Sequence, residues 1–306
     1  MRRKHIAGSI VVAAAVGGGC PDAGAVEGTL SVYSLGSGAV AAGTTPPEGA
    51  YFSFGTTYYR WRVAKPIPFA GTTISADIYM PVGVGTMLWV TPAVFLGGQL
   101  SFSVTSGFAD MKIIGGTTQS QQSARGTGAI DTSFRMSLGW KVNEAFSHKV
   151  SITQVAPTGR YAAGFNPDIG LNRPGTDLSW GASFTEPGSK IELSGTAGFT
   201  IEGYNPITRY RSGNAIHFEE GLSKYFDSGV RVGAISYQYV QVSGDSGSGA
   251  TLGPFRARAL AVGPSLGYTT LIAERVVSFT IQGTHDVASR NRLRQTSGLF
   301  MTTVKF

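Results

Sequence analysis

The sequence has little cysteine, little charge and no long apolar run after its first residues. One cysteine, Cys20, occurs among 306 residues, and charged residues make up 14% of the chain, where about 25% is usual. A single cysteine excludes an internal disulfide and a cysteine-based metal site. Without an apolar run of about 20 residues, the chain beyond its N-terminus has no candidate for a transmembrane helix.

Glycine and aromatic residues are abundant instead. The chain has 43 Gly, 17 Phe, 12 Tyr and 4 Trp, and its mean hydropathy is +0.05. Disordered chains are rich in charge and poor in aromatic residues, so disorder is excluded. A mainly helical protein is also disfavoured, because each Gly inside a helix costs about 1 kcal/mol relative to Ala. The composition therefore favours an all-β chain rich in turns.

The first residues have the features of a secretory signal. A basic start is followed by an apolar stretch at 6–16, and Ala23-Gly24-Ala25 resembles a signal-peptidase site. We interpret residues 1–25 as a signal peptide. The alternative is a lipoprotein cut before Cys20, but Gly17 stands where such a junction prefers Leu.

Several segments alternate apolar and polar residues with period two. In one of them Ile130, Phe134 and Met136 share a face, and the polar residues between them share the other. Segments 98–108, 190–202 and 274–285 repeat the pattern. This alternation is typical of strands with one face in an apolar medium.

The connections between the strands alternate in length. The pattern predicts twelve strands, at 50–62, 85–96, 98–108, 129–140, 145–155, 178–185, 190–202, 214–226, 230–242, 254–268, 274–285 and 297–306. Short connections alternate with long ones at 63–84, 109–128, 156–177, 203–213, 243–253 and 286–296. Short periplasmic turns and long external loops are typical of a bacterial outer-membrane barrel, whereas a soluble β-sandwich, the alternative, has no reason to alternate them.

The predicted fold is therefore an all-β, transmembrane, antiparallel up-and-down β-barrel over residues 50–306. Closure is required, because an open sheet edge in lipid would leave backbone groups without partners. Residues 26–49 are predicted to be a periplasmic segment or a plug in the lumen, and segment 63–84 is a second candidate to fold inward. The predicted location is the outer membrane of a Gram-negative cell.

The C-terminus and the basic residues suggest partners. Phe306 ends a strand whose face carries Phe300, Thr302 and Val304, an ending that resembles the signal read by the barrel-assembly machinery. The other predicted partners are membrane lipid, lipopolysaccharide and a small hydrophobic substrate, and export excludes nucleic acid. Cations in the predicted external loops could pair with lipopolysaccharide phosphates or attract anions; they are Arg173, Arg209, Arg211, Arg290, Arg292 and Arg294.

The alternation also predicts which polar side chains face the lumen. The candidates are Asp131, Arg135, Lys149, Glu192, His217, Glu219, Arg231, Gln238, Glu274 and Gln282. Both charge signs are present, so no simple ion selectivity follows. The three His that follow the signal have no ligand-like spacing and no nucleotide motif occurs, so we expect no metal and no cofactor.

Enzymatic chemistry finds little support. Gly244-Asp245-Ser246-Gly247 resembles the nucleophile loop of trypsin-like proteases, but it is better explained as turn sequence. An outer-membrane phospholipase would need a Ser and a His on the outer wall, with His148, His217 and His285 as candidates. His148 shares a face with Val150 and Ile152, and no Ser-containing nucleophile pattern stands near it. We expect no enzymatic activity.

Several motifs follow one another in a recognisable order. They are Ala156-Pro157-Thr158-Gly159-Arg160-Tyr161, Thr208-Arg209-Tyr210-Arg211-Ser212-Gly213 before His217, Tyr237-Gln238-Tyr239, Gly244-Asp245-Ser246-Gly247-Ser248-Gly249-Ala250 and Ala261-Val262-Gly263-Pro264. In this order, with Pro47-Glu48-Gly49 near the start, they resemble the MetA-pathway of phenol degradation family, to which SphA-like outer-membrane transporters are also similar. The resemblance implies a barrel that takes up aromatic or other hydrophobic compounds. It supplies no catalytic or ligand residues.

Two functional hypotheses follow. The first is a passive outer-membrane channel for small hydrophobic or aromatic compounds. The second is a closed structural or adhesive barrel whose loops bind a partner. An open lumen lined by apolar residues would favour the first, and a lumen filled by ion pairs and a plug would favour the second.

Overall fold

The fold is a β-barrel. The computed structural model describes residues 31–63, 67–69, 72–117, 121–162, 167–250 and 253–306. The predicted signal peptide at 1–25 and its alternative at Cys20 lie outside the described residues. No helix in the described part of the chain is long and apolar enough to cross a membrane.

Sixteen strands make up the described chain. They are β1 (Gly49–Arg62), β2 (Ile67–Phe69), β3 (Thr72–Phe95), β4 (Gly98–Thr117), β5 (Gln121–Ala129), β6 (Thr132–Lys141), β7 (Phe146–Ala156), β8 (Gly175–Thr185), β9 (Ile191–Glu202), β10 (Tyr204–Asn205), β11 (Tyr210–Arg211), β12 (Ala215–Tyr225), β13 (Val230–Gln241), β14 (Arg258–Ile272), β15 (Arg275–Arg290) and β16 (Arg294–Lys305).

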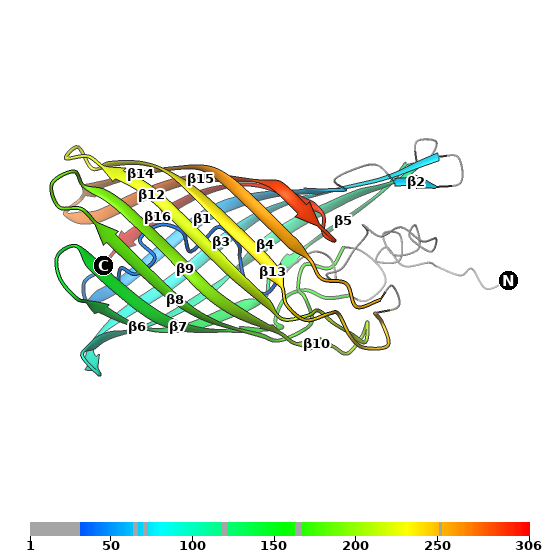
Figure 1. The fold of residues 1–306 in the computed structure, drawn as a ribbon, viewed down its shortest axis with the longest axis horizontal. Coiled ribbons are helices and arrows are strands. Elements are labelled where there is room, and N and C mark those ends of the chain that lie inside the picture. Colours follow the sequence, from blue (N-terminus) through cyan, green and yellow to red (C-terminus); the bar gives the residue numbers. More distant parts are fainter. Residues whose placement is uncertain (1–30, 64–66, 70–71, 118–120, 163–166, 251–252) are drawn as a thin grey trace.

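Twelve of these strands form the closed antiparallel wall. Leaving out β2, β5, β10 and β11, each strand pairs with the next along the chain, and β16 pairs back onto β1 (Figure 1). The closing register runs from Tyr51 opposite Lys305 to Arg62 opposite Arg294. The predicted all-β barrel with about twelve strands is confirmed.

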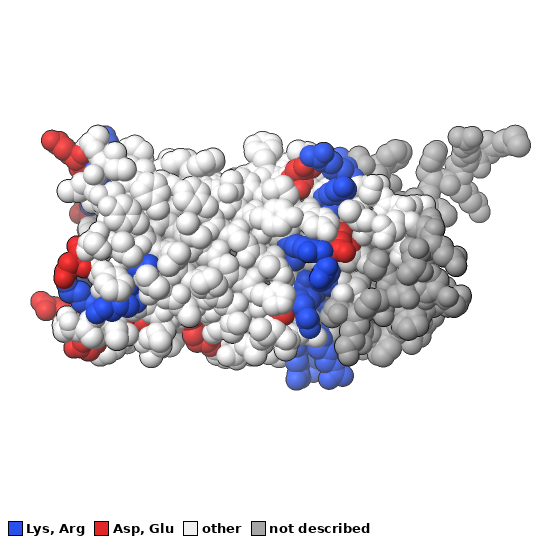
Figure 2. All heavy atoms as spheres, turned by 90° about the horizontal axis from the view of Figure 1, so that it is seen from above, with Lys and Arg blue, Asp and Glu red and all other residues white. Residues whose placement is uncertain are grey.

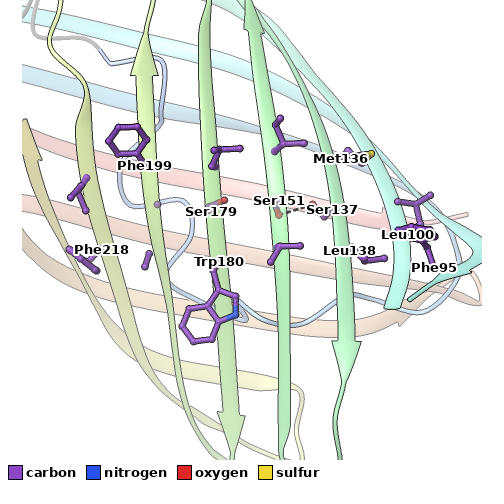
Figure 3. A pocket seen from close by; sticks show the side chains of 16 residues that line it. Phe95, Leu100, Met136, Ser137, Leu138, Ser151, Ser179, Trp180, Phe199 and Phe218 are labelled. Atoms are coloured by element: carbon purple, nitrogen blue, oxygen red, sulfur yellow. Dashed lines mark hydrogen bonds between the residues drawn. The ribbon is translucent and has the colours of Figure 1, made fainter. Parts of the chain in front are cut away.

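The wall has an apolar outer face. On β6, Phe134 and Met136 are exposed on the outer face, while the adjacent Ser137 is buried on the inner face. Figure 2 shows a broad uncharged band across the face in view, with charged side chains gathered at its two edges. Apolar side chains also line a hollow of about 850 Å³ that spans β6, β7, β8, β9 and β12, including Trp180, Phe199 and Phe218 (Figure 3). Such a wall belongs in lipid rather than water.

The two ends of the barrel differ. Short turns, such as 186–190 and 226–229, connect strands at what we call the turn end. Longer connections, such as 157–174 and 242–257, lie at the opposite loop end. By the usual asymmetry of outer-membrane barrels, the turn end is periplasmic and the loop end external.

Three predicted long loops are wrong. Most of 63–84 and 109–128 belongs to β3, β4 and β5, and β2 and β5 extend beyond the rest of the wall at the loop end (Figure 1). Segment 63–84 is therefore not an inward-folded loop over its described residues. The third, 286–296, reduces to a connection at 291–293, because β15 and β16 continue into it. On β3, both faces carry apolar residues, which hides the period-two pattern.

Candidate functional site in the barrel lumen

The first described residues run through the interior of the barrel. Figure 1 shows this blue segment inside the wall. Near the loop end, Ser31 Oγ donates a hydrogen bond to Glu202 Oε1 at 2.7 Å. Further along, Lys149 Nζ donates to the carbonyl oxygen of Thr44 at 3.2 Å. We call residues 31–48 the lumen segment.

Carboxylates of the wall hold the backbone of the lumen segment. Glu219 Oε1 accepts the N–H of Gly36 at 2.8 Å, and its other oxygen accepts the N–H of Gly38. Glu192 Oε1 accepts the N–H of Ala41 at 3.0 Å. Hydrogen bonds to an ionised acceptor are about twice as strong as neutral ones. The carboxylates of β9 and β12 therefore form an acidic track for this segment.

Hydroxyl groups of the same wall satisfy the carbonyl groups of the lumen segment. Ser194 Oγ donates to Ala39 O at 2.7 Å, and Thr196 Oγ1 donates to Gly38 O at 2.7 Å. Donors and acceptors of the segment are thus both paired by β9. This pairing gives the segment one defined position against the wall.

A buried His–Asp pair lies beside the acidic track. His217 Nε2 is 2.8 Å from Asp177 Oδ2, and Thr200 Oγ1 donates to the same carboxylate oxygen at 2.8 Å. The ring of Tyr33, from the lumen segment, stacks on the His217 ring. The partners of His217 are therefore an acid and a phenol ring.

Eight of the ten predicted lumen residues lie inside the barrel or at its loop-end mouth. Besides Lys149, Glu192, His217 and Glu219, Arg135 donates to Thr153 Oγ1 at 2.8 Å. Arg231 and Gln282 both donate to Ser265 Oγ, at 3.1 and 3.2 Å. Asp131 accepts the N–H groups of Gly159 and Leu171, at 2.8 and 2.7 Å. These two bonds hold both ends of the 157–174 connection at the loop-end mouth.

The other two predicted positions are wrong. Gln238 is on the outer face, where its side chain donates to Glu220 Oε1 at 3.3 Å. The inward residues of β13 are its neighbours Tyr237 and Tyr239, both buried. Glu274 is in the exposed turn between β14 and β15, with φ at +62°. On β13 the polarity is reversed, because tyrosines take the inner face and Gln238 bonds to a polar neighbour on the outer face.

An apolar inner wall was missed. On β3, Ile78, Met80 and Val82 point inward and are buried. They pack in one cluster with Trp61 of β1, Ala109 and Met111 of β4, and Ile169. Apolar residues are unusual on an inner face beside an aqueous lumen. The prediction of a loop at 63–84 left these residues without an assigned face. Their signal was the apolar alternate positions of 78–84, inside a segment interpreted as a loop.

A second apolar cluster faces the lumen from β13 and β14. Tyr237, Tyr239, Ala259 and Ala261 are buried there, and Leu35 of the lumen segment packs against them. Tyr237 also donates its hydroxyl to Asp286 Oδ1 at 2.5 Å. The lumen thus has an acidic track on β9 and β12 and apolar surfaces on the β1–β3–β4 and β13–β14 walls.

The described residues give no metal site: no group of three or more His, Cys, Asp or Glu among them could hold a metal ion. The hydrogen bonds of the described chain pair His217 with Asp177 and His285 with Thr296. His148 stacks on Trp140 on the outer face. A serine nucleophile bonded to histidine is thus absent from these hydrogen bonds.

Comparisons with known proteins agree with this architecture. The model of the family described as MetA-pathway of phenol degradation matches residues 67–301. The COG4313 outer membrane channel from Pseudomonas putida F1 has a similar fold, with TM-score 0.65 and 16% identity, covering 90% of this chain and 100% of that one. No curated protein matches the chain.

Two further solved barrels are more distant. They are the transport unit of the autotransporter AIDA-I from Escherichia coli, with TM-score 0.47, 11% identity and coverage of 90% and 93%, and the CymD monoaromatic hydrocarbon channel, with TM-score 0.41, 9% identity and coverage of 85% and 89%. Their scores are too low for further comparison.

Proposed function

The chain belongs to the MetA-pathway of phenol degradation family, and on that premise we propose that its barrel is a passive outer-membrane channel for small hydrophobic or aromatic compounds. The protein lies in the outer membrane of a Gram-negative cell. The activity proposed is permeation, without a chemical step on the solute.

The observation that carries this proposal is the apolar inner wall. Ile78, Met80 and Val82 are buried in a packed cluster on the inner side of the wall, so this side is apolar where a water-filled lumen has polar groups. Burial of apolar surface is worth about 25 cal/mol per Å², so an apolar solute gains free energy along this wall. The lumen segment occupies the polar track on β9 and β12, so we place the proposed path on the side of this apolar wall.

We assign the lumen segment the role of a plug. Its backbone is held by Glu192, Glu202 and Glu219 through hydrogen bonds that do not depend on its side chains. The barrel proper then comprises residues 49–306, and the segment at 31–48 controls the space inside it. The predicted signal at 1–25 completes this division of the chain.

The proposed partners include the assembly machinery and lipid. Phe306 directly follows β16, and its N–H donates to Ala50 O at 2.8 Å beside the closing strand pair. An aromatic residue at the seam between β1 and β16 is suited to a signal that the assembly machinery reads before the barrel closes. Lipopolysaccharide is the proposed lipid partner at the loop end.

The decisive experiment is uptake of a labelled monoaromatic hydrocarbon by cells with and without the protein. We expect faster uptake with the protein, and equal uptake of a charged solute such as benzoate in both strains. Equal hydrocarbon uptake would reject the channel. Parallel measurement of the protein in the outer membrane by cell-surface labelling keeps a null result interpretable.

One observation favours the alternative of a closed structural barrel. The lumen segment bonds to wall carboxylates and hydroxyls and stacks on His217 at the same time, so it is held inside the barrel by several independent contacts. In that case neither hydrocarbon uptake nor single-channel conductance would exceed the protein-free level. Surface binding by the loops would then be the activity to measure.

A further inference from the structure

Arginines gather on the outer face at the loop end of four neighbouring strands. Arg258 of β14, Arg290 of β15, Arg294 of β16 and Arg62 of β1 lie on outward positions, which we call the arginine patch. Figure 2 shows Lys and Arg collected along this edge of the uncharged band. Of the arginines predicted to meet lipopolysaccharide, Arg173 and Arg292 are buried and do not belong to the patch.

The patch places like charges directly opposite each other. Arg258 is the cross-strand partner of Arg290, and Arg62 is the partner of Arg294. Like charges in this position destabilise a strand pair. A sheet has no structural reason to repeat this arrangement twice, so an anion between the guanidinium groups is the natural complement.

A carboxylate pairs with one of the four arginines of the patch, and the other three have no ion pair among the described residues. Among the described residues the nearby acid is Asp77, which pairs with Arg60 at 3.0 Å and with Arg62 at 3.6 Å. The ion pairs of the described chain include none for Arg258, Arg290 or Arg294. The Nε atom of Arg294 is buried and has no hydrogen-bond partner. The patch therefore lacks a hydrogen-bond acceptor for this guanidinium nitrogen.

The depth of the patch fits a lipid headgroup. Toward the turn end the outward residues become apolar, immediately on β14 with Leu260 and Val262, and beyond Arg60 on β1 with Tyr58 and Phe54. The arginines therefore stand where the acyl-chain region ends. At the turn end of these strands the cations lie over rings instead, Arg275 over Phe306 and Lys305 over Tyr51.

We propose that the arginine patch binds the phosphate groups of lipid A in the outer leaflet. Guanidinium groups bind phosphate oxygens through two parallel hydrogen bonds, which ammonium groups do not. The two opposed arginine pairs lie on the neighbouring strand pairs β14–β15 and β16–β1 and offer two such positions. The inference depends on the outer-membrane location and is independent of what permeates the lumen.

The test measures the lipopolysaccharide that stays with the barrel during purification. The variant carries Arg258→Gln, Arg290→Gln, Arg62→Gln and Arg294→Gln, and the matched control carries Arg275→Gln and Lys305→Gln at the turn end of the same strands. We expect the patch variant to retain about tenfold less lipopolysaccharide per barrel than the wild type, and the control to retain the wild-type amount. Equal retention by wild type and patch variant would overturn the proposal.

A second measurement distinguishes lipid phosphate from free phosphate and guards against misfolding. In lipopolysaccharide-free micelles, removing opposed cations relieves repulsion, so the patch variant should unfold at the wild-type temperature or above it. Added lipopolysaccharide should raise the unfolding temperature of the wild type only, while inorganic phosphate should raise neither. Stabilisation by inorganic phosphate alone, or of both proteins alike by lipopolysaccharide, would reject the site. Hydrocarbon uptake by the patch variant should stay unchanged, which separates this outcome from the channel proposal.

Discussion

His217 of the wall lies face to face with Tyr33 of the lumen segment, with ring centroids 3.7 Å apart and planes inclined by 22°. The same histidine holds Asp177 at 2.8 Å. One side chain of β12 thus connects the segment to β8. Glu219, two residues further along β12, holds the segment again through Gly36 and Gly38. β12 therefore sets the position of the segment together with β9, whose side chains pair its backbone at Gly38, Ala39 and Ala41.

Removing the Glu219 carboxylate should loosen the lumen segment. Each hydrogen bond to a charged acceptor contributes about 1.5–3 kcal/mol, so Glu219→Ala should speed amide exchange at Gly36 and Gly38 by at least about tenfold. Hydrogen exchange followed by mass spectrometry measures this directly. Glu220→Ala is the matched control, because the neighbouring side chain lies on the outer face and bonds to Ser236. Equal exchange in both variants would show that Glu219 does not hold the segment.

A side chain at Gly181 should displace the lumen segment from β8. A Cβ at this glycine would lie 2.2 Å from the carbonyl oxygen of Ala42, which requires the segment to move. Overpacking costs about 1–3 kcal/mol, so we expect Gly181→Val to shift the equilibrium toward the displaced segment by about 5- to 100-fold. Planar-bilayer recordings should show larger or more frequent openings.

The neighbouring residue supplies the control for this substitution. Ala182 points outward on the same strand, so Ala182→Val gives the same final side chain on the lipid-facing side. Its recordings should match the wild type. Larger openings in Ala182→Val, or unchanged openings in Gly181→Val, would contradict contact between β8 and the segment as the closing interaction.

The sequence predicted the strands with one apolar face and missed what long-range contacts decide. Period-two alternation located all twelve wall strands and their short turns. β3 escaped in part, because Met80 and its neighbours make its inner face apolar as well. The path of the lumen segment could not be predicted, because its bonds to Glu192 and Glu219 span more than 150 residues. The alternation of neighbouring residues carries no information about hydrogen bonds between residues so far apart in the chain.

An amide on the apolar inner wall should hinder apolar solutes. Met80 is 7% exposed and points inward, whereas Met87 on the same strand is 69% exposed and points outward. An unpaired amide in an apolar site costs about 1–3 kcal/mol. We therefore expect Met80→Gln to slow hydrocarbon uptake about fivefold or more, and Met87→Gln to leave it close to the wild-type rate. Slower uptake in both variants to the same extent would point to reduced barrel levels, which surface labelling would reveal.

The turn at 186–190 should lose stability in acid. Hydrogen bonds from Ser189, by its side chain and its N–H, and from the N–H of Gly188 lower the pKa of Glu186 to about 2. Its ordinary pKa is about 4.3. Because folding lowers the pKa, the ionised carboxylate stabilises the turn at pH values above the ordinary pKa, and this contribution disappears as the pH falls toward 2.

Glu186→Gln should therefore lower the unfolding temperature at neutral pH and have progressively less effect as the pH falls from about 4.3 toward 2. Carbon-13 NMR of the Glu186 carboxyl should show the lowered pKa independently. Glu144→Gln, in the neighbouring turn at 142–145, is the matched substitution of an exposed acid. The contrary outcome is a difference in unfolding temperature between the wild type and Glu186→Gln that is the same at pH 7 and pH 2. The hydrogen bonds from Gly188 and Ser189 would then not depend on the charge of this carboxylate, and backbone geometry alone would hold the turn.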